Sequence, residues 1–242
     1  ALYPNPNDFG LYWRDTAVKT VGNVSAMFQI SFWNQWNQTD GKPFKLDEGY
    51  LRETPVVTDE LSAVALSSSD PGSIGPFNME ALLISIGEAS ESIKLCTPYF
   101  IPSEELSTAL KTAAAAGVDV ELMIPAAGDS WFVQHATYSY LKPLLERGVK
   151  VYLYEKGFLH AKTSIIDGKI AYVGTVNLDF RSFYINYEVA AVISNRDFCR
   201  NMEKQFDIDR ENCVMITIKD WKKRKAWKRG IDSLCRLLAP LL

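Results

Sequence analysis

Residues 160 to 177 read His160-Ala-Lys162-Thr-Ser-Ile-Ile-Asp167-Gly-Lys-Ile-Ala-Tyr-Val-Gly174-Thr175-Val-Asn177. Extended, mostly apolar runs on both sides of Asp167-Gly predict a β-hairpin, because Asp-Gly is a preferred two-residue turn. A hairpin brings Asn177 back beside His160. Lys162 follows the histidine by two residues in an extended segment, and its side chain therefore points to the same face.

These side chains suit the transfer of a phosphoryl group. Histidine can attack phosphorus or protonate a leaving oxygen near neutral pH. Lys162 can hold a phosphate oxygen as a point charge, Asn177 can donate its amide, and Thr175 adds a hydroxyl as a substrate-binding group. A lone His-x-Lys pair is common on a solvated surface, so the inference rests on all of these residues at this spacing.

The spacing resembles the motif of the phospholipase D superfamily, His-x-Lys-x4-Asp-x6-Gly-Ser-x-Asn, with Thr175 where the family usually has serine. The resemblance extends over nearly the whole chain, which is similar to the C-terminal half of a bacterial cardiolipin synthase. It is carried by residues 97–102, 157–159, 177–182 and 236–242.

Hydrophobic periodicity predicts strands that alternate with helices. The predicted helices cover residues 79–90, 103–117 and 130–147, and the predicted strands cover 92–97, 118–124 and 149–154. The hairpin and a strand at 187–194 add to this sheet. The fold class is therefore α/β, a layered α/β/α sandwich with a mixed, largely parallel sheet, and the resemblance implies the phospholipase D fold.

A weak internal repeat divides the chain. Residues 13–18, followed by an apolar helix, repeat the layout of residues 186–191 and the helix after them. We expect residues 1–40 to be the tail of a first phospholipase D-like copy whose own His-x-Lys would precede residue 1. Residues 41–75 are predicted to be an interdomain linker with one strand at 54–59. Residues 76–242 are predicted to form the second phospholipase D-like domain.

Charge is concentrated near the C-terminus. Residues 219–229 hold 7 of the 26 basic residues and 1 of the 29 acidic ones, which leaves 19 basic against 28 acidic residues elsewhere. The acidic remainder argues against a nucleic-acid partner. A basic stretch with Trp221 and Trp227 suits an anionic membrane surface, although a solvated helix face is the ordinary alternative. No run of about 18 apolar residues is present, so we expect any membrane anchor outside this chain.

The resemblance also implies a mechanism with two histidines and a covalent phosphohistidine, without a metal or other cofactor. Two copies of the motif would face each other, and His160 would act as general acid. We expect Glu188 to orient His160, and Asp15, its repeat equivalent, to serve the histidine of the first copy. Asp167 belongs to the motif but is expected to be mainly an anchor at the hairpin turn. Tyr99, after a strand end, is a candidate substrate-binding residue. His135 has no lysine two residues later and is expected to be a surface or capping residue.

Three functions stay open at this point. The first is phosphatidyl transfer between two phosphatidylglycerol molecules, giving cardiolipin and glycerol, on the cytoplasmic side of the bacterial cell membrane. The second is a homodimeric phosphodiesterase or nuclease of the same superfamily. The third is a non-catalytic fragment or binding module. In each case we expect the chain to need a first-half domain or a second copy of itself to complete a two-histidine site.

Overall fold

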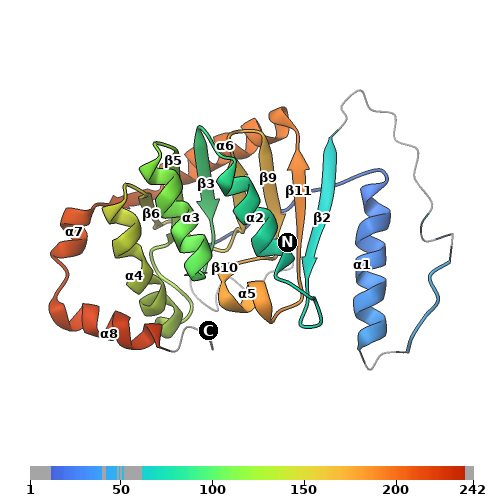
Figure 1. Ribbon diagram of the computed structural model, residues 1–242, viewed down its shortest axis with the longest axis horizontal. Helices are drawn as coiled ribbons and strands as arrows, with labels where there is room; N and C mark the ends of the chain where they lie inside the picture. The colour runs from blue at the N-terminus through green and yellow to red at the C-terminus, as the bar shows by residue number, and fades with distance from the viewer. Residues whose placement is uncertain (1–11, 40–41, 48, 50, 52–61, 238–242) are drawn as a thin grey trace.

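Eight strands form the main sheet of the computed structural model, which describes residues 12–39, 42–47, 49, 51 and 62–237. Their order across the sheet is β12 (Cys213–Ile216), β6 (Lys150–Tyr154), β5 (Asp119–Pro125), β3 (Ser92–Cys96), β8 (Thr163–Ile166), β9 (Ile170–Gly174), β11 (Glu188–Ser194) and β2 (Ala63–Ser69) (Figure 1).

Helices cover both faces of this sheet. On one face lie α2 (Phe77–Gly87), α3 (Glu104–Ala115) and α4 (Trp131–Glu146), and on the other lies α6 (Arg196–Arg210) (Figure 1). Leu95 and Leu122 are fully buried toward the first group of helices, whereas Ile165 and Ala171 pack against Cys199 of α6. Both faces of the central strands are thus buried, and the predicted α/β/α layering is confirmed.

The helix boundaries follow from local chemistry that the sequence displays. The side chains of Ser103 and Ser130 cap α3 and α4 by accepting from the backbone N–H groups of Leu106 and Val133. The hairpin turn is the predicted one, because Asp167 (φ 52°) and the following glycine (φ 57°) both have positive φ.

The prediction of a largely parallel sheet is wrong. Parallel pairing joins β3 to β5 and β5 to β6, where a helix carries the chain back between the strands. The other five neighbouring pairs of the sheet are antiparallel. The reason is that β8 enters beside β3 in the opposite direction, and the chain then returns through the tight hairpin.

The predicted linker 41–75 also needs correction. Strand β2 pairs with β11 along its whole length, from Ala63 opposite Ser194 to Ser69 opposite Glu188. The sheet therefore begins no later than residue 63, and the domain boundary predicted at residue 76 is too late. The strand predicted at 54–59 lies outside the described residues.

The N-terminal segment approaches the sheet at one point. Strand β1 (Tyr12–Arg14) pairs in parallel with β7 (Gly157–Leu159), directly before His160. Gly157 permits this contact, since a Cβ there would lie 2.0 Å from the backbone oxygen of Tyr12. Helix α1 (Val24–Gln38) comes next in the chain and lies on the outer side of β2 (Figure 1). It has no buried residue. Its assignment to a first copy of the domain stays a prediction.

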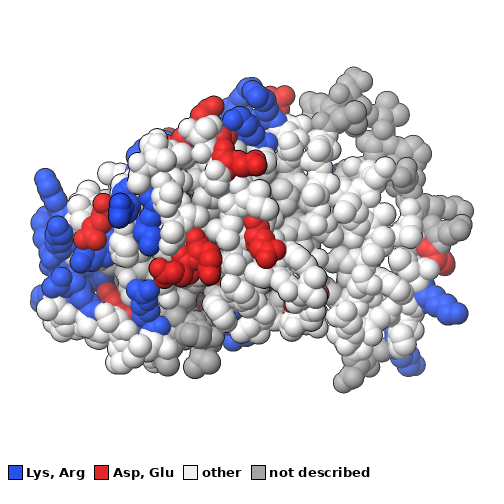
Figure 2. Space-filling view, in the orientation of Figure 1, with Lys and Arg blue, Asp and Glu red and all other residues white. Residues whose placement is uncertain are grey.

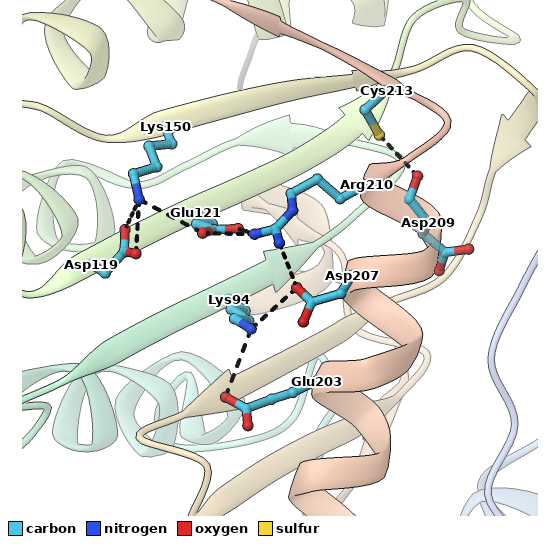
Figure 3. Close-up of polar contacts among 9 residues, drawn as sticks. All are labelled: Lys94, Asp119, Glu121, Lys150, Glu203, Asp207, Asp209, Arg210 and Cys213. Atoms are coloured by element: carbon cyan, nitrogen blue, oxygen red, sulfur yellow. Dashed lines mark hydrogen bonds and ion pairs between the residues drawn. The ribbon is translucent and has the colours of Figure 1, made fainter.

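A network of ion pairs fixes α6 against the strands (Figure 3). Arg210 bonds the carboxylate of Glu121, which is 3% exposed, at 3.0 Å, and also contacts Asp207 at 3.0 Å. Lys94 of β3 lies 3.5 Å from Asp207. The network sets the position of the last turn of α6, and this turn carries Asp209, which reaches toward β1.

Candidate active site

His160 lies between β7 and β8, held by its backbone and by both ring nitrogens. Its N–H donates to the carbonyl oxygen of Arg14 at 2.8 Å. Nδ1 lies 2.9 Å from Oδ2 of Asp15, and Nε2 lies 3.0 Å from Nζ of Lys162. A carboxylate accepts, so Nδ1 carries the proton and Nε2 keeps a lone pair that accepts from the lysine. This is the tautomer that a nucleophile or a general base requires.

The expected partner of His160 is therefore wrong. Glu188 is buried at the start of β11, where its Oε1 accepts from the Ser182 hydroxyl at 3.1 Å and the Asn186 amide at 3.2 Å. Asp15, which was expected to serve the histidine of a first copy, contacts His160 instead. The physical reason is the pairing of β1 with β7, which carries the residues after Arg14 to the histidine.

Arg14 fixes the segment that presents Asp15. Its guanidinium forms an ion pair with Asp209 of α6 at 2.7 Å, and it also donates to the carbonyl oxygen of Asp15 and to the hydroxyl of Thr16. The Trp13 ring packs 5.0 Å from the imidazole of His160. Asp209 was not among the predicted residues, because nothing in the spacing of the sequence connects α6 with residue 14.

Lys162 is the cation of the site. Its Nζ also donates to the carbonyl oxygen of His160 at 2.6 Å. Burial lowers the pKa of Lys162 to about 8, although the carboxylates of Asp15 and Glu188 act in the opposite direction. An apolar pocket behind the lysine, lined by Leu82 and other core side chains, explains this desolvation. At neutral pH the ammonium is still the main form and can neutralise a phosphate oxygen.

Asn177 and Thr175 follow β9 at the same edge of the sheet. The Thr175 hydroxyl accepts from the backbone N–H of Val189 at 3.0 Å, so it supports the pairing with β11. Among the described residues, the buried Oδ1 of Asn177 has no hydrogen-bond partner. Asp179 caps the short helix α5 (Phe180–Tyr184) by accepting from Ser182. Burial raises the pKa of Asp179 to about 6, against the hydrogen bonds from Ser182 and Asn177.

Asp167 lies away from this site, at the turn between β8 and β9. Its carboxylate accepts from the backbone N–H groups of Ser90, Glu91 and Ser92 at 2.8 to 3.2 Å. Burial acts in the opposite direction, but these N–H groups hold the pKa of Asp167 well below its usual range. These contacts are those of the anchor expected at the hairpin turn, so Asp167, although part of the motif, is not placed as a catalytic residue.

We expect Asp167→Asn to lower the free energy of unfolding by about 2 kcal/mol at neutral pH, since several hydrogen bonds to a charged acceptor are weakened. A folded-state pKa below the unfolded one stabilises the protein above about pH 4, and this stabilisation is lost as the pH falls. The difference in the free energy of unfolding between wild type and variant should therefore become smaller at acid pH. Urea denaturation at several pH values measures it, with the exposed Asp197→Asn as control. A gap that is independent of pH would contradict the assignment.

Two further candidates lie elsewhere. Tyr99 donates its hydroxyl to Asp129 at 2.5 Å and lines a separate small pocket at the start of α4. Burial raises the pKa of Tyr99, and Asp129 adds to the effect. His135 on α4 lies 2.6 Å from Asp232. Neither residue joins the groove around His160.

The groove itself is open and lies between residues 15–18 and the edge of β9 and β11. It is lined by Asp15, Thr16, His160, Lys162, Gly174 and Thr175, among others. Over the described part of the chain, no group of three or more His, Cys, Asp or Glu side chains is placed to hold a metal ion. Within the same residues, no helix is long and apolar enough to cross a membrane.

The chain is similar to cardiolipin synthases over nearly its whole length. The family model described as "Cardiolipin synthase, PLD-like domain" matches residues 82–210. Cardiolipin synthase 2 of Bacillus cereus is 37% identical over 240 residues, which are 99% of this chain and 46% of that protein. A cardiolipin synthase of Halalkalibacterium halodurans is 36% identical over 96% of this chain and 46% of its own length. The chain thus spans about half the length of these curated relatives.

Solved structures share the fold. A phosphatidylserine synthase of Haemophilus influenzae matches with a TM-score of 0.59 and 16% identity, over 77% of this chain and 47% of that chain. Nuc of Salmonella typhimurium, a phospholipase D family member, matches with a TM-score of 0.55 and 21% identity, over 65% of this chain and 99% of that chain. At these identities the likeness shows the fold alone.

Proposed function

The chain belongs to the cardiolipin synthase family of phospholipase D-like domains, and from this premise we propose that it supplies one half of the active site of a phosphatidyltransferase. The reaction moves the phosphatidyl group of one phosphatidylglycerol to a hydroxyl of another, giving cardiolipin and glycerol. The observation that carries the proposal is the bonding of His160 to Asp15 on one ring nitrogen and to Lys162 on the other.

The proposed reaction has two steps. A histidine of one half attacks phosphorus through its lone pair, and the bond from phosphorus to the glycerol oxygen breaks as the histidine of the other half protonates that oxygen. The second histidine then removes a proton from the hydroxyl of a second phosphatidylglycerol. The resulting oxygen attacks phosphorus, and the bond to the first histidine breaks. We assign the proton-transfer role to His160, which begins the cycle as an imidazolium with a second proton on Nε2 in place of the hydrogen bond from Lys162. That proton leaves with the glycerol in the first step and is regained from the hydroxyl in the second.

The two-histidine requirement makes this a half site. His135 is bonded to Asp232 on the outer side of α4 and does not face His160. Glu188, the repeat equivalent of Asp15, is buried and already oriented by Ser182 and Asn186. We propose that each half supplies the carboxylate for the histidine of the other, so that Glu188 bonds the missing histidine. Lys162 and its counterpart would share the charge of the phosphate.

The proposed place of action is the cell membrane, with this domain on the cytoplasmic side. The membrane location is supported by the lipid nature of the proposed substrates. All four cysteines are free, and three of them are buried, which fits a reducing compartment.

We expect the monomeric chain to show little or no turnover of phosphatidylglycerol, and activity to return when a first-half polypeptide with its own His-x-Lys is added. The assay follows cardiolipin and glycerol release, with bis-nitrophenyl phosphate as a generic phosphodiester. A first-half polypeptide with its histidine changed to alanine is the control. Turnover of the generic diester alone, by a dimer of this chain, would favour the homodimeric phosphodiesterase. Robust turnover by a strict monomer would refute the shared site.

A further inference from the structure

A basic surface lies at one end of the molecule. Helices α7 (Ile218–Lys222) and α8 (Ala226–Arg236) pack on the outer side of α4, and Figure 2 shows Lys and Arg side chains gathered over them. Over residues 217–237, all of them described, Asp220 is the one exposed acidic residue. The exposed basic residues there are Lys219, Lys222, Lys223, Lys225, Lys228, Arg229 and Arg236.

Large apolar side chains are exposed among these cations. Trp227, Leu234 and Leu237 are 59%, 65% and 75% exposed. Trp131 and Phe132, at the start of α4, are each more than half exposed as well. Trp131 packs 4.3 Å from the ring of His135, which itself bonds α8, so the two groups adjoin. We call these seven cations and five apolar residues the basic-aromatic surface.

Buried contacts join α8 to the rest of the domain. Asp232 of α8 is 3% exposed and bonds His135 at 2.6 Å and Arg224 at 2.5 Å. The Arg224 guanidinium lies 4.2 Å from the ring centre of the buried Trp221. Cys235 packs against the core below α8. The cations therefore project from helices that are packed against the domain.

This surface begins at the edge of the sheet that carries the active site. Helix α4 starts shortly after the end of β5, which runs parallel to β3. At the end of β3, Cys96 pairs with Thr163, the residue directly after Lys162. Trp131 follows the end of β5, and His160 precedes the start of β8. Both residues therefore lie at the same edge of the sheet.

We propose that the basic-aromatic surface docks on an anionic lipid bilayer and so places the His160 edge near the membrane. Lysine and arginine are attracted to anionic headgroups, and tryptophan rings favour the headgroup level. Nucleic acid also attracts cations, but the exposed leucines would gain nothing on a phosphate backbone, whereas a bilayer can bury them. Only the choice of phosphatidylglycerol as the lipid rests on the proposed function.

The test measures partition of the whole chain onto vesicles of phosphatidylglycerol mixed with phosphatidylcholine, and onto vesicles of phosphatidylcholine alone. We expect binding to the anionic vesicles that weakens with added salt. Lys222→Glu with Lys225→Glu should lower the partition about 25-fold or more, since each cation near the surface contributes roughly fivefold. Arg196→Glu with Lys204→Glu, exposed positions of α6 with the same change of charge, is the matched control and should bind nearly as wild type.

Three further variants or measurements separate a loss of docking from a loss of folding and from a loss of catalysis. Trp227→Ala should also weaken binding, and unchanged circular dichroism should show that each variant is folded. His160→Ala should bind vesicles as wild type does, so docking and catalysis can fail separately. Equal binding to phosphatidylcholine, full binding by the Lys222/Lys225 variant, or tighter binding to an oligonucleotide than to the anionic vesicles would overturn the proposal.

Discussion

His160→Ala is expected to abolish phosphatidyl transfer in any assembly that contains this chain, with a loss of at least about 10⁴-fold in kcat. The alanine can neither take up nor release the proton of the alcohol, and the Asp15 carboxylate loses the group that it orients. The fold should stay intact, because the side chain borders an open groove. Single-turnover assays with phosphatidylglycerol and a reconstituted first half would measure the loss.

The matched control is the other histidine. His135→Gln keeps a polar side chain on α4 and leaves the groove untouched, so turnover of a soluble phosphodiester should stay close to the wild-type rate. Near-normal turnover in His160→Ala, or an equal loss in both variants, would remove His160 from the mechanism.

Asp15→Asn is expected to lower kcat by about 10²- to 10⁴-fold with little change in KM, because an amide does not fix the Nδ1–H tautomer of His160 as a carboxylate does. A structural role alone would not separate kcat from KM in this way.

Two variants separate the carboxylate from its neighbours. Asp15→Glu should recover part of the lost rate, since it restores the charge. Gly157→Ala should reproduce much of the Asp15→Asn defect without touching either partner, because its Cβ would push β1 away from β7. A Glu188→Gln variant that loses proton transfer at His160, while Asp15→Asn retains it, would reverse the assignment of the two acids.

The hairpin and its turn were predictable from the sequence, although β9 runs one residue further, to Gly174. Its strands end where the Asp167-Gly turn requires, and the serine caps of α3 and α4 are equally local signals. Strand β2 was missed because its sequence, Ala-Val-Ala-Leu-Ser-Ser-Ser, ends in residues typical of a linker and is ordered by pairing with β11. The direction of β8 beside β3 is likewise a tertiary property that periodicity does not contain.

The candidate site divides in the same way. Spacing alone brought His160 and Lys162 together, since an extended segment fixes their relation. The repeat predicts that Asp15 and Glu188 are equivalent, but equivalence does not say which histidine each one faces. That choice depends on a contact between residues 145 positions apart, made possible by one missing Cβ at Gly157.

Because the acid that orients His160 arrives on a strand that contributes little to the core, the unit of folding and the unit of chemistry have different borders. A boundary drawn by packing would fall near residue 62 and discard Asp15. Hybrids that join the first half of one such protein to the second half of another would then inherit a histidine from one parent and its carboxylate from the other. Whether residues 12–16 travel with the first or the second half should decide which hybrids work, even when both halves fold equally well.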